Sequence, residues 1–169
     1  YENINEKLQV TQKAKLLRQI GLNIEIIDSH LKWFYMFIMP DIIKLDTNDL
    51  GIYMPLKGSR WMEAQKSASE TIKALAIIGG QWPHTSYMLP GGVMSDPTKL
   101  DLVMMQNYLQ NTISFFEKSI SGVSLENYLD FDSIDNLENL SADLKYFKDL
   151  SFKYTLEKYG KSHNRFITL

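Results

Sequence analysis

Apolar residues recur at alternating spacings of three and four in the first quarter of the chain, which places them on one face of a helix. This face carries Leu17, Ile20, Ile24, Ile27, Leu31, Phe34 and Ile38. The pattern predicts one long helix from about residue 5 to residue 38, bent near Gly21 and ended by Pro40. Because further apolar residues lie off this face, we expect burial on several sides in the second half. They include Leu16, Ile26, Trp33 and Phe37.

Two further helices are predicted on either side of a segment rich in glycine and proline. The first begins with a cap at Ser59 and ends at Gly79 and Gly80, because glycine readily adopts the positive φ that closes a helix. The second begins near residues 96–98 and runs to about Ser119. Its predicted buried side consists of Leu100, Val103, Met104, Leu109, Ile113 and Phe116.

Turn-forming residues fill the connections. Residues 46–58 predict a loop, in which Ile52 and Met54 are the expected apolar anchors. Residues 85–95 predict a short extended or hairpin insertion, because Pro90 presets one dihedral angle and Gly91 supplies the positive φ that must follow.

A last helix is predicted from Ser141 to Tyr159, with a stop at Gly160 and a β-compatible tail from His163 to Leu169. Together these elements predict a mainly α fold: a multi-helix domain with one long N-terminal helix and a short hairpin insertion around residues 85–95. We expect a single helical domain over residues 1–169, since a chain of this length buries roughly 70% of its unfolded surface.

Composition narrows the classes of function. The net charge is −2 and no basic cluster stands out, so nucleic acid is not an expected partner. The chain has no cysteine, which excludes disulfides, iron–sulfur ligation and thiolate metal sites within it. Residues 130–139 are acidic, and a solvated surface is favoured over a calcium site because the glycine-centred ligand spacing is missing.

Two segments resemble a known family. GGQWPH at residues 79–84 is followed by PGGV at residues 90–93, and DSHLKWFYMFIMPD stands earlier at residues 28–41. The first two closely resemble the middle of the large subunit of nickel–iron hydrogenases, especially the uptake and hydrogen-sensing members. The earlier segment is similar to that family's SHxxHFYxLxxPD helix. The resemblance runs from about Leu16 to Phe116, with a weaker continuation to the C-terminus.

The resemblance implies a parent protein that oxidises H2 to protons and electrons at a nickel–iron centre. In that family two cysteine pairs hold the metals, in motifs of the form R-x-C-G-x-C and D-P-C-x-x-C-x-x-H, and neither occurs here. The chain is therefore expected to be an excised internal segment, inactive alone and without a cofactor of its own. The parent's compartment stays open between a membrane-associated or periplasmic and a cytoplasmic location.

The resemblance also implies partners. These are the remainder of the large subunit and the iron–sulfur small subunit, and self-association through exposed apolar surface is a further expectation. The residues that it singles out as structural are His30, Trp82, Pro83, His84, Gly91 and Gly92.

No catalytic, cofactor-binding or metal-binding residue is expected, since no histidine pair has the helical spacing of a zinc site. His30 shares a helix face with Ile26, Trp33 and Phe37, so we predict a hydrogen-bonded core histidine. His84 is predicted to order the loop near the parent's active site, with simple loop packing as the alternative. The glycine pairs are predicted to serve backbone geometry rather than phosphate binding.

Two other classes of function stay open. A stand-alone, cysteine-free helical module related to hydrogenase would bind a partner through the apolar stretch from Leu31 to Met39, as a chaperone or regulator. An unrelated enzyme that uses Asp28, His30 and His84 is less favoured, because no nucleophile or oxyanion donor accompanies them. A large exposed apolar patch would favour the hydrogenase segment, whereas a polar surface with one groove would favour the module.

Overall fold

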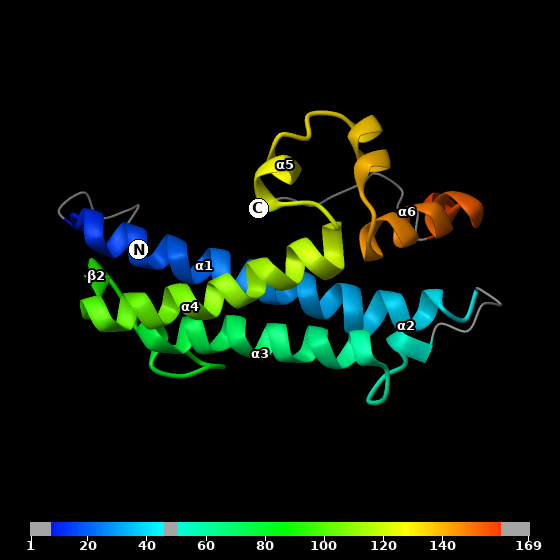
Figure 1. Cartoon of the computed structure of the whole chain (residues 1–169). Helices are drawn as coiled ribbons and strands as arrows, with labels where there is room; N and C mark the ends of the chain where they lie inside the picture. Colours follow the sequence, from blue (N-terminus) through cyan, green and yellow to red (C-terminus); the bar gives the residue numbers. More distant parts are fainter. Residues whose placement is uncertain (1–7, 46–50, 160–169) are drawn as a thin grey trace. The chain divides into compact units, whose positions relative to one another are not determined.

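The computed structural model describes residues 8–45 and 51–159, and its fold is mainly α (Figure 1). The predicted mainly α class, with one long N-terminal helix and a short hairpin, is confirmed. The chain divides into two compact units, Tyr1–Phe115 and Phe116–Leu169. The expectation of a single domain stays a prediction. None of the described helices is long and apolar enough to cross a bilayer.

The N-terminal helix consists of α1 (Gln12–Lys32), the π-helical segment η1 (Trp33–Ile38) and α2 (Met39–Ile42), one directly after the other. Thr11 caps its start, since the hydroxyl accepts a hydrogen bond from the backbone N–H of Ala14 at 3.2 Å. The prediction of helix before Thr11 is wrong for residues 8–11, because the cap requires extended backbone there. Residues 5–7 lie outside the described part of the chain.

Pro40 does not end this helix, contrary to prediction. In the preceding π-helical turn the backbone N–H of Met39 bonds to the carbonyl of Phe34, five residues back instead of four. A proline inside an α-helix loses a hydrogen bond and clashes with the carbonyl four residues earlier. The wider π turn relieves that conflict, so the helix continues through Pro40 to Ile42.

The next helix, α3 (Ser59–Gly79), has its bounds close to those predicted. Its N-cap is Gly58 rather than Ser59, and Gly80 closes it with a φ of 75°. The preceding loop contains the short 3-10 helix η2 (Gly51–Tyr53). Tyr53 is buried there, whereas the predicted anchors Ile52 and Met54 are both exposed, so that prediction is wrong.

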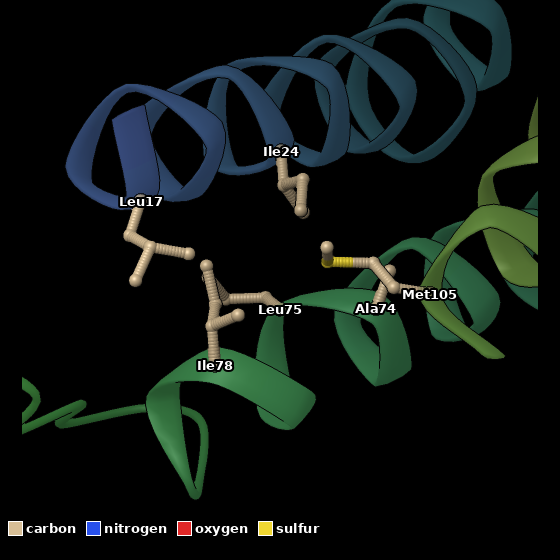
Figure 2. Close-up of a cluster of buried hydrophobic side chains, with 6 residues drawn as sticks. All are labelled: Leu17, Ile24, Ala74, Leu75, Ile78 and Met105. Atoms are coloured by element: carbon tan, nitrogen blue, oxygen red, sulfur yellow. The ribbon is translucent and has the colours of Figure 1, made fainter. Parts of the chain in front are cut away.

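In the first unit, α3 packs against both α1 and α4 (Lys99–Phe115) and runs in the opposite direction to them (Figure 1). Side chains from all three helices point into one core (Figure 2). This cluster comprises Leu17, Ile24, Ala74, Leu75, Ile78 and Met105. Small buried residues on α3 let its neighbours approach closely. They are Ala64, Ser67, Ala68, Thr71 and Ala74.

The predicted buried side of α4 is largely wrong. Its predicted members Leu100, Val103 and Met104 are exposed, and Met105 and Thr112 are buried instead. The Thr112 hydroxyl lies 2.9 Å from that of Thr71 on α3, so both buried hydroxyls have a partner. A paired hydroxyl can thus occupy a core position that an apolar pattern does not reveal.

The start of α4 is capped reciprocally. The Thr98 hydroxyl accepts a hydrogen bond from the Asp101 N–H at 3.2 Å, and the Asp101 carboxylate accepts one from the Thr98 N–H at 2.8 Å. The helix therefore begins after Thr98 rather than at the predicted residues 96–98. Hydrogen bonds from the Thr98 side chain and backbone lower the pKa of Asp101 below its ordinary value.

This cap predicts a dependence of stability on pH. Because the folded pKa of Asp101 is lowered, the unfolded chain takes up a proton first, and the contribution of Asp101 is lost as the pH falls through its folded pKa. We expect the Tm of the Asp101→Asn variant to lie below wild type near pH 6 and to approach it near about pH 3. Thermal unfolding followed by circular dichroism measures this difference in Tm. A difference that does not change with pH would contradict the role of the Asp101 carboxylate in the cap.

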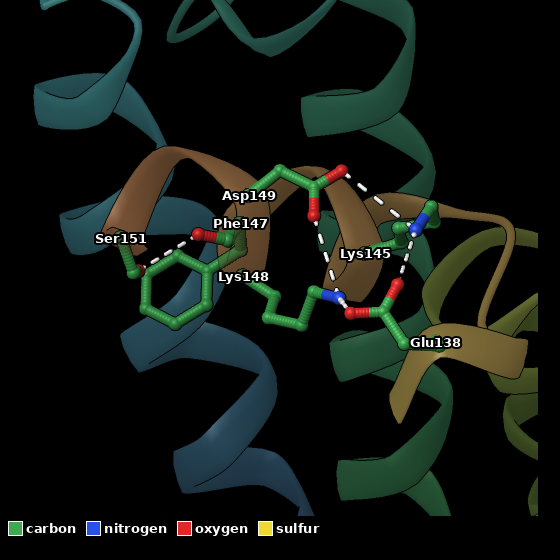
Figure 3. A network of polar contacts seen from close by, with 6 residues as sticks. All are labelled: Glu138, Lys145, Phe147, Lys148, Asp149 and Ser151. Atoms are coloured by element: carbon green, nitrogen blue, oxygen red, sulfur yellow. Dashed lines mark hydrogen bonds and ion pairs between the residues drawn. The ribbon is translucent and has the colours of Figure 1, made fainter. Parts of the chain in front are cut away.

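The second unit begins with the π-helical segment η3 (Phe116–Ser121). It continues with α5 (Leu125–Leu129), the 3-10 helix η4 (Ile134–Asn139), α6 (Asp143–Lys153) and the 3-10 helix η5 (Leu156–Lys158). Glu138 accepts hydrogen bonds from Lys145 at 3.3 Å and Lys148 at 2.5 Å, which joins η4 to α6 (Figure 3).

The last helix is shorter than the predicted Ser141–Tyr159. It ends at Lys153, because Thr155 adopts a left-handed φ of 50° that an α-helix does not allow. The predicted stop at Gly160 and the tail from His163 to Leu169 lie outside the described residues.

Candidate functional site

The hairpin insertion is formed by β1 (Met88–Leu89) and β2 (Gly92–Val93), which pair antiparallel with Leu89 opposite Gly92. Gly91 in the turn has a φ of 86°, the left-handed conformation that glycine tolerates best. A Cβ atom there would also lie only 2.6 Å from the side chain of Leu8. Gly92, by contrast, has open space around it. Backbone geometry therefore requires glycine at position 91 and not at position 92.

Arg18 on α1 fastens this hairpin to the helix. Its Nη2 atom donates to the carbonyl oxygens of Leu89 and Gly92, at 2.7 Å each. One guanidinium thus holds both strands at the point where they leave the turn. Lys13 on α1 forms a further ion pair with Asp96, just beyond the hairpin.

Gly21 on α1 leaves room for the ring of Tyr87, which precedes the hairpin. A Cβ atom on Gly21 would lie 2.1 Å from the Tyr87 hydroxyl oxygen, so only glycine fits beneath that ring. Burial raises the pKa of the Tyr87 phenol, the Glu25 carboxylate raises it further, and Arg18 opposes both. The phenol is consequently neutral at ordinary pH.

Lys32 joins the two segments that carry the family resemblance. Its ammonium lies 2.6 Å from the Asp28 carboxylate and 4.3 Å from the centre of the Trp82 ring. Asp28 is 4% exposed, and its second oxygen Oδ1 has no hydrogen-bond partner among the described residues. Lys32 therefore provides the charge that balances a buried carboxylate while it holds the GGQWPH loop against α1.

Removal of the Lys32 ammonium should lower the stability of the fold. Replacing Lys32 by methionine keeps the aliphatic stem but leaves the Asp28 carboxylate buried without a countercharge, so we expect a loss of about 1–3 kcal/mol in the free energy of unfolding. Urea unfolding followed by circular dichroism measures the loss. A matched control is Lys44→Met, because Lys44 pairs at 2.7 Å with the exposed Asp41; that change should cost less than about 1 kcal/mol. Equal losses in the two variants would contradict the role of Lys32.

The two histidines of the resemblance lie apart from this ion pair. His84 is exposed and has a left-handed φ of 68°, and its carbonyl accepts a hydrogen bond from the Gln81 side chain at 3.0 Å. Pro83, also exposed, follows Trp82 through a cis peptide bond. His30 is exposed on α1, so the prediction of a core histidine is wrong. The buried polar residue of that turn is Asp28, two positions earlier.

Large apolar side chains remain exposed along the outer side of α1 and η1. Leu22, Ile26, Trp33 and Phe37 follow one another at helical spacing, and Trp33 is 53% and Phe37 67% exposed. The expected burial of this helix on several sides is therefore not found. We call these four residues the outer stripe; a stripe of this kind is typical of a surface that another protein covers.

The contacts made by Arg18 and Lys32 hold the hairpin and the GGQWPH loop against α1. Within the described part of the chain, no three His, Asp or Glu side chains come together as a metal site would require. Reasoning from the sequence missed Arg18 and Lys32, which make the decisive contacts. The spacing of four between Asp28 and Lys32 is a signal that could have indicated their ion pair. Nothing local indicates the reach of Arg18 to the hairpin.

Comparison of the chain with known protein families and with curated proteins finds no match.

Proposed function

We propose that this chain is an internal helical part of the large subunit of a nickel–iron hydrogenase of the uptake type, whose parent oxidises H2. On this proposal the chain supports the active site from outside and supplies no metal ligand. The nickel–iron centre is held by cysteines elsewhere in the parent, and the partners are the rest of the large subunit and the iron–sulfur small subunit.

One observation carries this proposal. The two segments that resemble the family lie about fifty residues apart in sequence, yet Lys32 of the first stands over the ring of Trp82 in the second. On the same helix, Arg18 donates a hydrogen bond to the hairpin that follows, and Gly21 leaves room for the Tyr87 ring before it. Motifs that belong to one functional unit are expected to meet in the fold, as these do.

The exposed outer stripe on α1 and η1 supports the same proposal. Large apolar residues such as Trp33 and Phe37 are unfavourable in contact with water, so a segment of a larger subunit would bury them against the rest of that subunit. The same stripe also favours the second candidate, a stand-alone module that binds a partner through residues 31–39. The two candidates differ in one property: only the hydrogenase proposal requires that the complete protein contain a nickel–iron centre.

The decisive experiment uses the complete product of the gene that encodes this segment. Its flanking sequence should contain the two cysteine motifs, and the purified product should contain nickel and iron and reduce a viologen dye with H2. Elemental analysis and dye absorbance measure these properties. Absence of both motifs and of nickel from the full product would refute the hydrogenase proposal and leave the module. Activity of the isolated chain with added nickel would contradict its purely structural role.

The role of His84 can be tested in the same product. If His84 orders the loop near the active site, His84→Ala should lower the H2-oxidising activity while the nickel content stays unchanged. Gln81→Ala, which removes the hydrogen bond to the His84 carbonyl, should have a smaller effect in the same direction. Unchanged activity and stability in His84→Ala would leave simple loop packing as its role.

A further inference from the structure

The second unit contains an open pocket that the proposed function does not use. Its volume is about 410 Å³. It is lined by Tyr128, Phe131, Asp132, Ser133, Ile134 and Leu137. These residues come from the end of α5, from η4 and from the short connection between them, so one continuous segment forms the pocket.

Aromatic rings form a fixed wall of this pocket. Tyr128 packs edge-on against Phe116 with ring centres 4.9 Å apart, and Phe131 lies 5.4 Å beyond Tyr128. Ile134 also lines the pocket and remains 75% exposed. The cavity therefore offers apolar surface to an incoming side chain, and its aromatic wall is already held in place.

The segment that forms the pocket is anionic. Asp132 lines the pocket, and Asp130 and Asp135 stand next to its lining residues in the sequence. These three have no cationic partner among the described residues, whereas Glu138 is neutralised by Lys145 and Lys148 on α6 (Figure 3). The sequence has no lysine, arginine or histidine between residues 119 and 144. One carboxylate in the pocket and two more on the segment that forms it favour a ligand that combines an apolar group with positive charge.

We propose that this pocket binds a basic amphipathic peptide segment of a partner protein. One large apolar side chain of that segment enters between Phe131 and Ile134. Lysine or arginine residues on either side of it face Asp132 and Asp135. Recognition of this kind combines burial of an apolar anchor with charges that select the partner and speed its approach.

The test titrates the full chain into a fluorescently labelled peptide with leucine and tryptophan on one helical face and lysine on the other. Fluorescence anisotropy should show saturable binding that weakens with salt. A second peptide with glutamate in place of lysine, and a third with serine in place of the apolar residues, should not bind. Equal binding of the lysine and glutamate peptides, or no binding of the lysine peptide, would overturn the proposal.

Variants locate the site. The double change Asp132→Asn with Asp135→Asn should raise the Kd of the lysine peptide by about 3- to 10-fold, as expected for the loss of two exposed ion pairs. It should also make the binding less dependent on salt. Glu157→Gln removes an exposed charge outside the pocket and should leave Kd within about twofold. Ile134→Ser, at an exposed position, should weaken binding without lowering Tm. If Asp132 and Asp135 prove no more important than Glu157, the peptide binds elsewhere and the proposal fails.

Discussion

Replacement of Leu75 by alanine is expected to lower the free energy of unfolding by about 2–5 kcal/mol. Leu75 is almost completely buried on α3, in one cluster with Leu17 and Ile24 of α1 and Met105 of α4 (Figure 2). The truncation removes apolar contacts within this cluster and leaves a cavity, because a packed core relaxes only partly. Urea unfolding monitored at 222 nm by circular dichroism, a standard helix signal, measures the loss.

The matched control is Leu100→Ala. Leu100 is 69% exposed on α4, although the sequence pattern places it on the buried side. Its truncation should change the free energy of unfolding by no more than about 0.5 kcal/mol. A large loss at Leu100 with a small one at Leu75 would mean that α4 faces the core with the side that the sequence pattern predicts.

Replacement of Gly21 by alanine is the second change with a large expected effect. The new methyl group would lie 2.1 Å from the Tyr87 hydroxyl oxygen, so the buried Tyr87 side chain must shift away from α1. We expect a loss of about 1–3 kcal/mol in the free energy of unfolding, as for overpacking of a well-filled core. Tyr87→Phe, which removes that oxygen, should recover part of the loss when combined with Gly21→Ala.

Gly92→Ala serves as the control for this change. A Cβ atom on Gly92 meets no atom within 4 Å, so the variant should unfold close to wild type. Additive effects of Gly21→Ala and Tyr87→Phe in a double-mutant cycle would contradict the close approach between α1 and Tyr87.

The N-terminal helix could be predicted from the sequence because most of its core face is apolar. Leu17, Ile24, Leu31 and Phe34 recur at helical spacing and are buried as expected. Ile27, predicted on the same face, is exposed. The central helix α3 is different, since it packs on two sides and its core positions carry alanine, serine and threonine. Residues of this size are too weakly apolar for the sequence pattern to reveal two contact faces on α3. The pattern therefore does not indicate which side of α4 faces α3 either.

In the candidate site, too, local features could be predicted from the sequence and long-range contacts could not. Turn chemistry located the hairpin and the special role of Gly91, because proline and glycine restrict the backbone locally. The contacts that hold the hairpin depend on residues about seventy positions away, such as Arg18, and a linear pattern does not encode such pairs. The sequence pattern predicts a core position for His30 because it predicts burial of the apolar residues on the same helix face, and these residues are exposed together with His30.

The π-helical turn before Pro40 has a consequence for how this helix tolerates changes in length. A π turn contains one residue more than the α-helical turn that it replaces. Loss of one residue between Trp33 and Ile38 would restore regular α-helical bonding, and the residues that follow would keep nearly the same positions around the helix axis, because the wide turn takes up one extra residue. Met39 and Ile42, both buried, would still face the core. Pro40 would then stand in a regular α-helical turn, where its ring meets the carbonyl four residues earlier. The extra residue therefore acts as a spacer for Pro40, and a deletion here would strain the helix without turning it.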